Sequence, residues 1–159
     1  MLPGTLRHSS LHQTLHQLKQ DWNCNTNLLF LDFDGVWIIP DGQYKALVSR
    51  INQLCHTYQL EVVITSSYRK NMEFCETILR MNNFKGIIQG CTELNDDDRC
   101  TQILQYLQTH PFQHFVILDD MFLESFQGFA VKCEFFTGFD DAAYDEAVQI
   151  LQRQIKGTS

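Results

Sequence analysis

Short apolar runs alternate with amphipathic segments along most of the chain. Residues 5–22 are predicted to form an amphipathic helix, because large apolar residues recur there every three to four positions. These residues are Leu11, Leu15, Leu18 and Trp22. A polar break at residues 23–27 precedes an apolar run at residues 28–32, which is typical of a strand buried on both faces of a parallel sheet. We expect residues 1–24 to pack beside a core that spans residues 28–155.

The alternation of strands and helices continues toward the C-terminus. Further strands are predicted at residues 61–65, 86–89, 114–120 and 130–136. Helices between them are indicated by apolar residues at helical spacing: Leu47, Ile51, Leu54 and Tyr58; Met72, Cys75 and Leu79 within residues 69–81; Ile103, Leu104 and Leu107; and Val148, Leu151 and Ile155. Parallel strands need crossover connections, which place helices on both faces of the sheet. The pattern therefore predicts an α/β fold, a Rossmann-like three-layer α/β/α sandwich with a mainly parallel sheet, in a single domain over residues 1–159.

Acidic residues precede two of the predicted helices. Asp96, Asp97 and Asp98 come before one of them, and Asp140 or Asp141 precedes the last. Aspartate accepts hydrogen bonds from the free backbone N–H groups at a helix start. We interpret residues 96–98 as a solvated cap and not as a second metal site.

The composition favours a packed core. Apolar residues make up 44 % of the chain and charged residues 19 %, a balance typical of globular proteins. The six cysteines include no CxxC pair, so they are expected to be reduced core thiols. Five phenylalanines are expected in the core and not on a base-stacking surface: Phe112, Phe115, Phe122, Phe135 and Phe136.

The net charge of the chain restricts the kinds of partner that it can bind. A net charge of −7 disfavours nonspecific binding to long DNA, although it leaves room for a local basic rim. The N-terminal residues are polar and lack the apolar run of a signal peptide, and no stretch is long enough to span a membrane. We therefore expect a cytoplasmic protein without a membrane partner, with export by another route left open. We also expect a monomer or a weak dimer.

Polar residues follow the apolar runs of three predicted strands. The first strand ends in Asp32, the second in Thr65 and Ser66, and a later one in Asp119 and Asp120. The carboxyl ends of parallel strands share one edge of the sheet, where ligands bind. Carboxylates gathered there would repel one another unless a cation lies between them, and hard oxygen ligands suit Mg²⁺. The sequence therefore predicts a magnesium site at this edge.

The same residues resemble a known family. LFLDFDGVW at residues 29–37, then VVITSSYR, then an arginine on a helix and finally FVILDD resemble the haloacid dehalogenase (HAD) superfamily of aspartate-nucleophile phosphatases over residues 28–151. The GVW-x-x-P step, SSYR, GCTELNDDDRCTQILQYL and FFTGF further resemble the compact, capless phosphatase-like domains of Swiss Army knife RNA-repair proteins.

The resemblance implies roles for the residues of the first two motifs. Asp32 would be the nucleophile that forms an aspartyl-phosphate. Asp34 would be the general acid and base, and its backbone carbonyl would be a metal ligand. Gly35 would allow the sharp turn that follows it, and the loop at residues 36–43 would be a small flap over the site. Thr65 would hold a phosphoryl oxygen with help from the backbone N–H of Ser66, and the hydroxyl of Ser66 is the alternative.

The resemblance also implies the cation and the remaining metal ligands. The third motif of the family is usually a lysine, and the best match here is Arg99. Lys70, Lys85 and Arg69 are its rivals, and Arg69 is also a candidate substrate-binding residue. Asp119 would bind Mg²⁺ together with Asp32 and Asp34. Asp120 would either join them as a direct ligand or orient a water bound to the metal.

The short spacing between the motifs predicts that no cap domain covers the site. An open site favours a phosphate on a large molecule, such as an RNA or DNA end or a phosphoprotein, over a small phosphomonoester. The resemblance thus implies a Mg²⁺-dependent phosphatase. Two alternatives are a binding or regulatory module with little catalysis and a phosphotransferase that uses the same intermediate.

Overall fold

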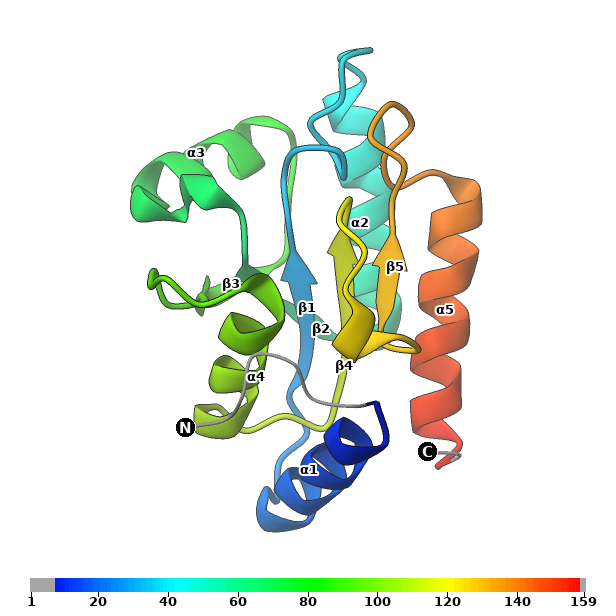
Figure 1. The fold of residues 1–159 in the computed structure, drawn as a ribbon. Helices are drawn as coiled ribbons and strands as arrows, with labels where there is room; N and C mark the ends of the chain where they lie inside the picture. Colours follow the sequence, from blue (N-terminus) through cyan, green and yellow to red (C-terminus); the bar gives the residue numbers. More distant parts are fainter. Residues whose placement is uncertain (1–7, 158–159) are drawn as a thin grey trace.

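Five parallel strands form one sheet in the computed structural model, which describes residues 8–157 (Figure 1). The strands are β1 (Asn27–Leu31), β2 (Leu60–Ile64), β3 (Ile87–Cys91), β4 (His114–Asp119) and β5 (Ala130–Lys132). Their order across the sheet is β3-β2-β1-β4-β5, and all neighbouring pairs run parallel. The chain therefore places β2 and β3 on one side of β1 and then crosses over to place β4 and β5 on the other side.

Helices cover both faces of this sheet (Figure 1). Helices α2 (Tyr44–Tyr58), α3 (Met72–Met81) and α5 (Asp141–Ile155) pack on one face. Helices α1 (His8–Asp21) and α4 (Arg99–Thr109) pack on the other. These three layers confirm the predicted Rossmann-like α/β/α fold.

Strand residues alternate between two buried clusters. Leu31 and Leu118 point into the layer that contains α2, α3 and α5. Phe30 and Ile117 point into the layer that contains α1 and α4. Because β1, β2 and β4 are buried on both faces, each of them reads as a continuous apolar run in the sequence.

The predicted caps correspond to two helix starts. Asp98 accepts a hydrogen bond from the Thr101 N–H at 2.7 Å, and Asp140 accepts one from Ala143 at 2.9 Å. The cap of α5 is therefore Asp140 and not Asp141. Helix α3 begins at Met72, later than predicted, because the short 3-10 helix η1 (Ser67–Lys70) precedes it. A second 3-10 helix, η2 (Glu124–Phe126), lies before β5.

Several aromatic residues that were expected in the core are exposed. Strand β5 ends at Lys132, so Phe135 and Phe136 lie in the turn beyond the sheet, and the side chain of Phe136 is 72 % exposed. Phe122, in the loop after β4, and Ile155, at the end of α5, are also exposed. The prediction was wrong for the three phenylalanines because no helix in the described chain covers the loop and the turn that hold them. Ile155 is exposed because it is the last residue of α5. Phe112 and Phe115 are buried as expected.

The predicted first helix included residues 5–7, which lie outside the described residues, and the described helix ends at Asp21. Between residues 8 and 157, no helix combines the length and the apolar character needed to cross a bilayer.

Candidate active site

Three polar residues lie side by side at the carboxyl edge of the sheet. Leu31 of β1 is paired in register with Ile64 of β2 and Leu118 of β4. The residues that come next are Asp32 after β1, Thr65 after β2 and Asp119 at the end of β4, so these three are neighbours. The Asp32 N–H donates a hydrogen bond to the Leu118 carbonyl at 3.1 Å. The strand order reverses between β1 and β4, because β2 and β3 lie on one side of β1 while β4 and β5 lie on the other. In open α/β sheets, ligands bind at the carboxyl ends of the strands at such a reversal.

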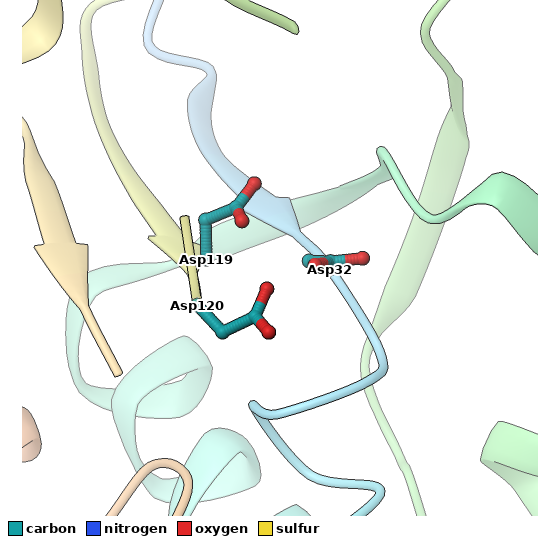
Figure 2. A group of neighbouring side chains, drawn as sticks. All are labelled: Asp32, Asp119 and Asp120. Atoms are coloured by element: carbon teal, nitrogen blue, oxygen red, sulfur yellow. The ribbon is translucent and has the colours of Figure 1, made fainter. Parts of the chain in front are cut away.

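Three carboxylates converge at this point (Figure 2). Asp32, Asp119 and Asp120 each offer an oxygen, and these oxygens lie within 4.8 Å of one another. Asp32 is 6 % exposed and Asp119 is fully buried. Burial and the neighbouring Asp119 raise the pKa of Asp32 from 3.8 to about 7, and burial also raises the pKa of Asp119. Burial away from water and mutual repulsion disfavour the negative charge of these carboxylates, and a divalent cation bound between them would stabilise it. This donor set therefore fits Mg²⁺, which prefers carboxylate oxygens.

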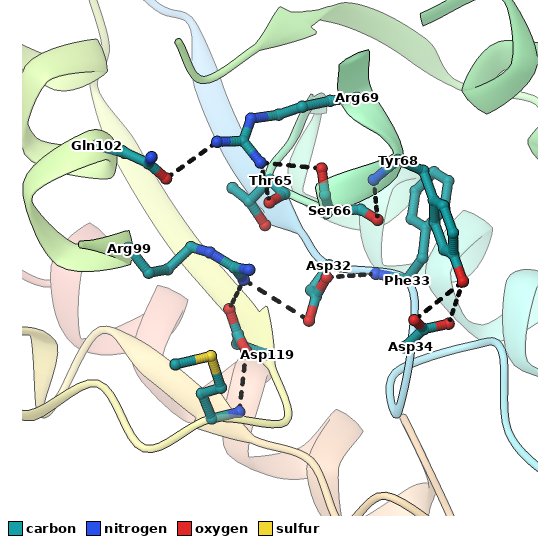
Figure 3. Close-up of polar contacts among 11 residues, drawn as sticks. Asp32, Phe33, Asp34, Thr65, Ser66, Tyr68, Arg69, Arg99, Gln102 and Asp119 are labelled. Carbon is teal, nitrogen blue, oxygen red and sulfur yellow. Dashed lines mark hydrogen bonds and ion pairs between the residues drawn. The ribbon is translucent and has the colours of Figure 1, made fainter. Parts of the chain in front are cut away.

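Arg99 lies against the same carboxylates (Figure 3). It is the first residue of α4, and its Nη1 donates a hydrogen bond to Asp119 Oδ2. The same Nη1 is 3.6 Å from Asp32 Oδ2. Lys85 precedes β3 and therefore lies at the opposite edge of the sheet, and Lys70 is exposed without an ion pair to the described acids. Among the candidates for the third motif, the geometry favours Arg99.

The two candidate hydroxyls after β2 have different surroundings. Ser66 Oγ accepts a hydrogen bond from the Tyr68 N–H at 3.1 Å and so caps η1. Thr65 Oγ1 is buried and has no hydrogen-bond partner among the described residues. A buried hydroxyl without a partner is rare, and a phosphoryl oxygen at this edge would satisfy it. This arrangement favours Thr65 over Ser66 as the hydroxyl that holds phosphate.

Asp34 lies in a tight turn that follows β1. The Gly35 N–H donates to the Ile38 carbonyl at 2.9 Å, and the Ile38 N–H donates to Phe33 at 3.0 Å. The carboxylate of Asp34 does not belong to the acid cluster and instead accepts hydrogen bonds from the hydroxyl of Tyr68 (Figure 3). The backbone contact of Asp34 to Mg²⁺ stays a prediction.

Gly35 brings this turn against the acid cluster. Its φ is +77°, a conformation that side chains with a Cβ rarely adopt. A Cβ at Gly35 would also lie 2.7 Å from Asp120 Oδ2. Glycine is therefore required both by the backbone and by the close approach of Asp120. These observations support a role for Gly35 in the shape of the site, whereas direct contact with substrate stays a prediction.

Arg69 has a different environment from the one predicted. Arg69 is 6 % exposed, and its guanidinium uses all five donors within the protein. The acceptors are the backbone carbonyls of Thr65, Ser66, Thr92 and Glu93 and the side chain of Gln102. No donor is left for a substrate, so the substrate-binding interpretation of Arg69 is corrected to a structural one. Residue spacing could not indicate this environment, because four of the five acceptors are backbone carbonyls and two of these, in Thr92 and Glu93, are 23 and 24 residues away.

Tyr68 is the residue of the site that the sequence did not single out. It lies within the SSYR motif, between the predicted hydroxyls and Arg69. Its contact with Asp34 joins positions 34 residues apart. The SSYR motif was the available signal, because it follows β2 at the same edge of the sheet as the acid cluster.

The profile of the family described as the HAD domain in Swiss Army Knife RNA repair proteins matches residues 28–144. This range contains strands β2 to β5, all of β1 except its first residue, and every residue of the acid cluster. The chain matches no curated protein and no solved structure. Because the profile covers most of the chain, and the fold and the strand-end acids agree with it, the chain belongs to the family of HAD domains found in Swiss Army Knife RNA repair proteins.

Proposed function

We propose that the protein is a Mg²⁺-dependent phosphatase that hydrolyses a phosphomonoester through an aspartyl-phosphate on Asp32. Membership of the HAD family suggests a phosphatase-type hydrolase, and HAD domains generally use Mg²⁺. The observation that carries the proposal is the position of Asp32, which ends the central strand between Thr65 and Asp119 and faces Arg99.

The reaction would proceed in two displacements at phosphorus. A carboxylate oxygen of Asp32 attacks phosphorus while the bond to the ester oxygen breaks, and Asp34 gives its proton to that leaving oxygen. A water molecule then attacks phosphorus, gives a proton to Asp34 and releases phosphate from Asp32. Thr65 and Arg99 are placed to donate hydrogen bonds to the phosphoryl oxygens. Mg²⁺ held by Asp32, Asp119 and Asp120 would neutralise the combined charge of carboxylates and phosphate.

Hydrolysis of an aryl phosphate with and without Mg²⁺ tests this proposal. We expect hydrolysis to require Mg²⁺ and to be lost in Asp32→Asn, because an amide does not attack phosphorus. Asp41→Asn is the matched control, since Asp41 is an exposed acid on the flap and lies outside the cluster. Full activity of Asp32→Asn would refute the proposal.

We further propose that the phosphate is carried by a nucleic-acid end. Support comes from the exposed apolar side chains that follow β4 and β5 at the same edge of the sheet as Asp119: Met121, Phe122, Phe135 and Phe136. Phe135 and Phe136 contact each other edge to face, with ring centroids 5.3 Å apart. Aromatic surfaces of this kind stack on unpaired bases without reading their sequence.

Matched substrates test the nature of the phosphate carrier. We expect faster hydrolysis of a 3′-phosphate or a 5′-phosphate oligonucleotide than of a phosphopeptide of similar size. Phe136→Ser would remove part of this preference and leave aryl phosphate hydrolysis unchanged, because Phe136 is exposed and lies outside the acid cluster. Equal rates for all three substrates would exclude a nucleic-acid preference.

A further inference from the structure

We propose that Tyr68 is a positioning residue that holds the carboxylate of Asp34 in place for proton transfer to the leaving oxygen. The inference rests on the proposed phosphatase function. It is based on the position of the Tyr68 hydroxyl, which lies 3.0 Å from Asp34 Oδ2 and 3.2 Å from Asp34 Oδ1 (Figure 3). This contact joins the segment after β2 to the turn after β1.

The backbone of Asp34 is held by its turn, but its side chain depends on Tyr68. The turn is closed by the N–H groups of Gly35 and Ile38, which fix the chain on either side of Asp34. No other hydrogen bond or ion pair to the carboxylate of Asp34 occurs within residues 8–157. Without the hydroxyl, the carboxylate would be free to change rotamer at the half-exposed mouth of the site.

Tyr68 is itself held from two directions. Its N–H donates to Ser66 Oγ at 3.1 Å, which anchors the backbone at the start of η1. Its ring contacts Phe33, at a centroid distance of 6.2 Å, and packs edge to face on Phe74 at 6.1 Å. These contacts pre-organise the hydroxyl before substrate binds.

A fixed carboxylate matters most where proton transfer limits the rate. Asp34 gives its proton to the leaving oxygen in the first displacement and recovers one from water in the second. Tyr68 keeps its own proton throughout and transfers none. An alkoxide is a poor leaving group and needs the proton, whereas p-nitrophenolate leaves without it. The contribution of Tyr68 should therefore depend on the leaving group.

Tyr68→Phe tests the proposal on two substrates, p-nitrophenyl phosphate and butyl phosphate. The measured quantity is kcat/KM, which reports the steps through aspartyl-phosphate formation and so leaves out the second displacement that both substrates share. We expect kcat/KM for butyl phosphate to fall about tenfold or more, because misplacing a general acid costs part of its about 10²- to 10⁴-fold contribution. We expect kcat/KM for p-nitrophenyl phosphate to stay within about twofold, since departure of p-nitrophenolate needs no proton. An equal fall on both substrates would mean a merely structural role and would overturn the proposal, as would no change on either.

Tyr44→Phe is the matched control. Tyr44 also lies near the flap, and its ring packs edge to face on Trp37 at 6.1 Å. No hydrogen bond of its hydroxyl is found in the described part of the chain. We expect this variant to match the wild type on both substrates, which would tie the effect to the hydroxyl of Tyr68.

A double-mutant cycle checks the contact without using activity. Tyr68→Phe, Asp34→Ala and the double variant are unfolded in urea, and the shifts of the midpoint are compared. We expect clearly non-additive shifts, because both single replacements remove the same hydrogen bond. Additive shifts would overturn the Tyr68–Asp34 contact even if the wild type is an active phosphatase. An inactive wild type would instead refute the proposed function, and with it the role of Tyr68, even if the shifts are non-additive.

Discussion

Replacing Arg69 with leucine should destabilise the protein far more than an ordinary surface substitution would. The guanidinium connects the ends of β2 and β3 to α4 through five hydrogen bonds of 2.9 to 3.3 Å. Leucine fills part of the volume but donates to none of the five acceptors. The segments that carry Thr65 and Ser66 would then lose a shared anchor next to the active site.

The size of the effect follows from what the variant leaves unpaired. Each buried acceptor that loses its donor costs about 1–3 kcal/mol, and water can reach some of them once the segments loosen. The costs are not additive, so the five contacts together give an expected loss of about 3–5 kcal/mol. Typical domains are stable by only about 5–15 kcal/mol. Arg69→Leu should therefore approach the limit of folding.

Chemical unfolding followed by circular dichroism measures this loss. Arg80→Leu is the matched control on α3, because Arg80 is exposed and interacts mainly with Phe84, through one hydrogen bond of 3.1 Å to its carbonyl and a ring contact. We expect this control to lose less than about 1 kcal/mol. If Arg69→Leu lost no more than Arg80→Leu, the structural role of Arg69 would be refuted. A raised KM at unchanged stability would restore the substrate-binding interpretation.

Three further predictions concern the acid cluster. Gly35→Ala and Gly42→Ala both place alanine at φ +77°, which costs about 1–2 kcal/mol, but only Gly35→Ala adds a clash with Asp120. Titration calorimetry should therefore show weaker Mg²⁺ binding for Gly35→Ala and unchanged binding for Gly42→Ala. Equal weakening in both variants would contradict the close approach of Gly35 to Asp120. Arg99→Gln should lower phosphatase turnover about 100-fold and tighten Mg²⁺ binding, because one positive charge leaves the site; unchanged turnover at saturating Mg²⁺ would exclude Arg99 from the third motif. The pKa of Asp32, raised from 3.8 to about 7, means that the metal-free folded protein keeps a proton that the unfolded chain has released. Its contribution to stability should therefore be lost as pH rises from about 4 to about 7, and thermal unfolding in EDTA, compared with Asp32→Asn, would contradict this if both proteins had the same pH slope.

The sequence predicted the architecture because the fold depends on local patterns. Apolar runs of strand length, separated by helical spacing, are enough to indicate a parallel sheet with helices on both faces. The same logic brought Asp32, Thr65 and Asp119 to one edge, since each directly follows a buried run. Resemblance to the HAD family added roles to these positions, and the chain does belong to that family.

What the sequence could not predict depends on contacts between distant segments. Arg69 looks like an available cation, yet carbonyls from two strand ends enclose it. Tyr68 reaches Asp34 only because the turn after β1 bends toward η1. Phe135 and Phe136 have the composition of core residues, but β5 ends before them and nothing in the described chain covers them. Periodicity carries no information on any of these arrangements.

Trapping the phosphorylated enzyme tests the central claim most directly. Borohydride reduces an acyl phosphate to an alcohol, so an aspartyl-phosphate at Asp32 would become homoserine, which peptide mass spectrometry can locate. We predict homoserine at position 32 only when substrate and Mg²⁺ are both present, and none at Asp34, Asp119 or Asp120. Turnover without any modification at Asp32, or with modification of another acid, would contradict the account.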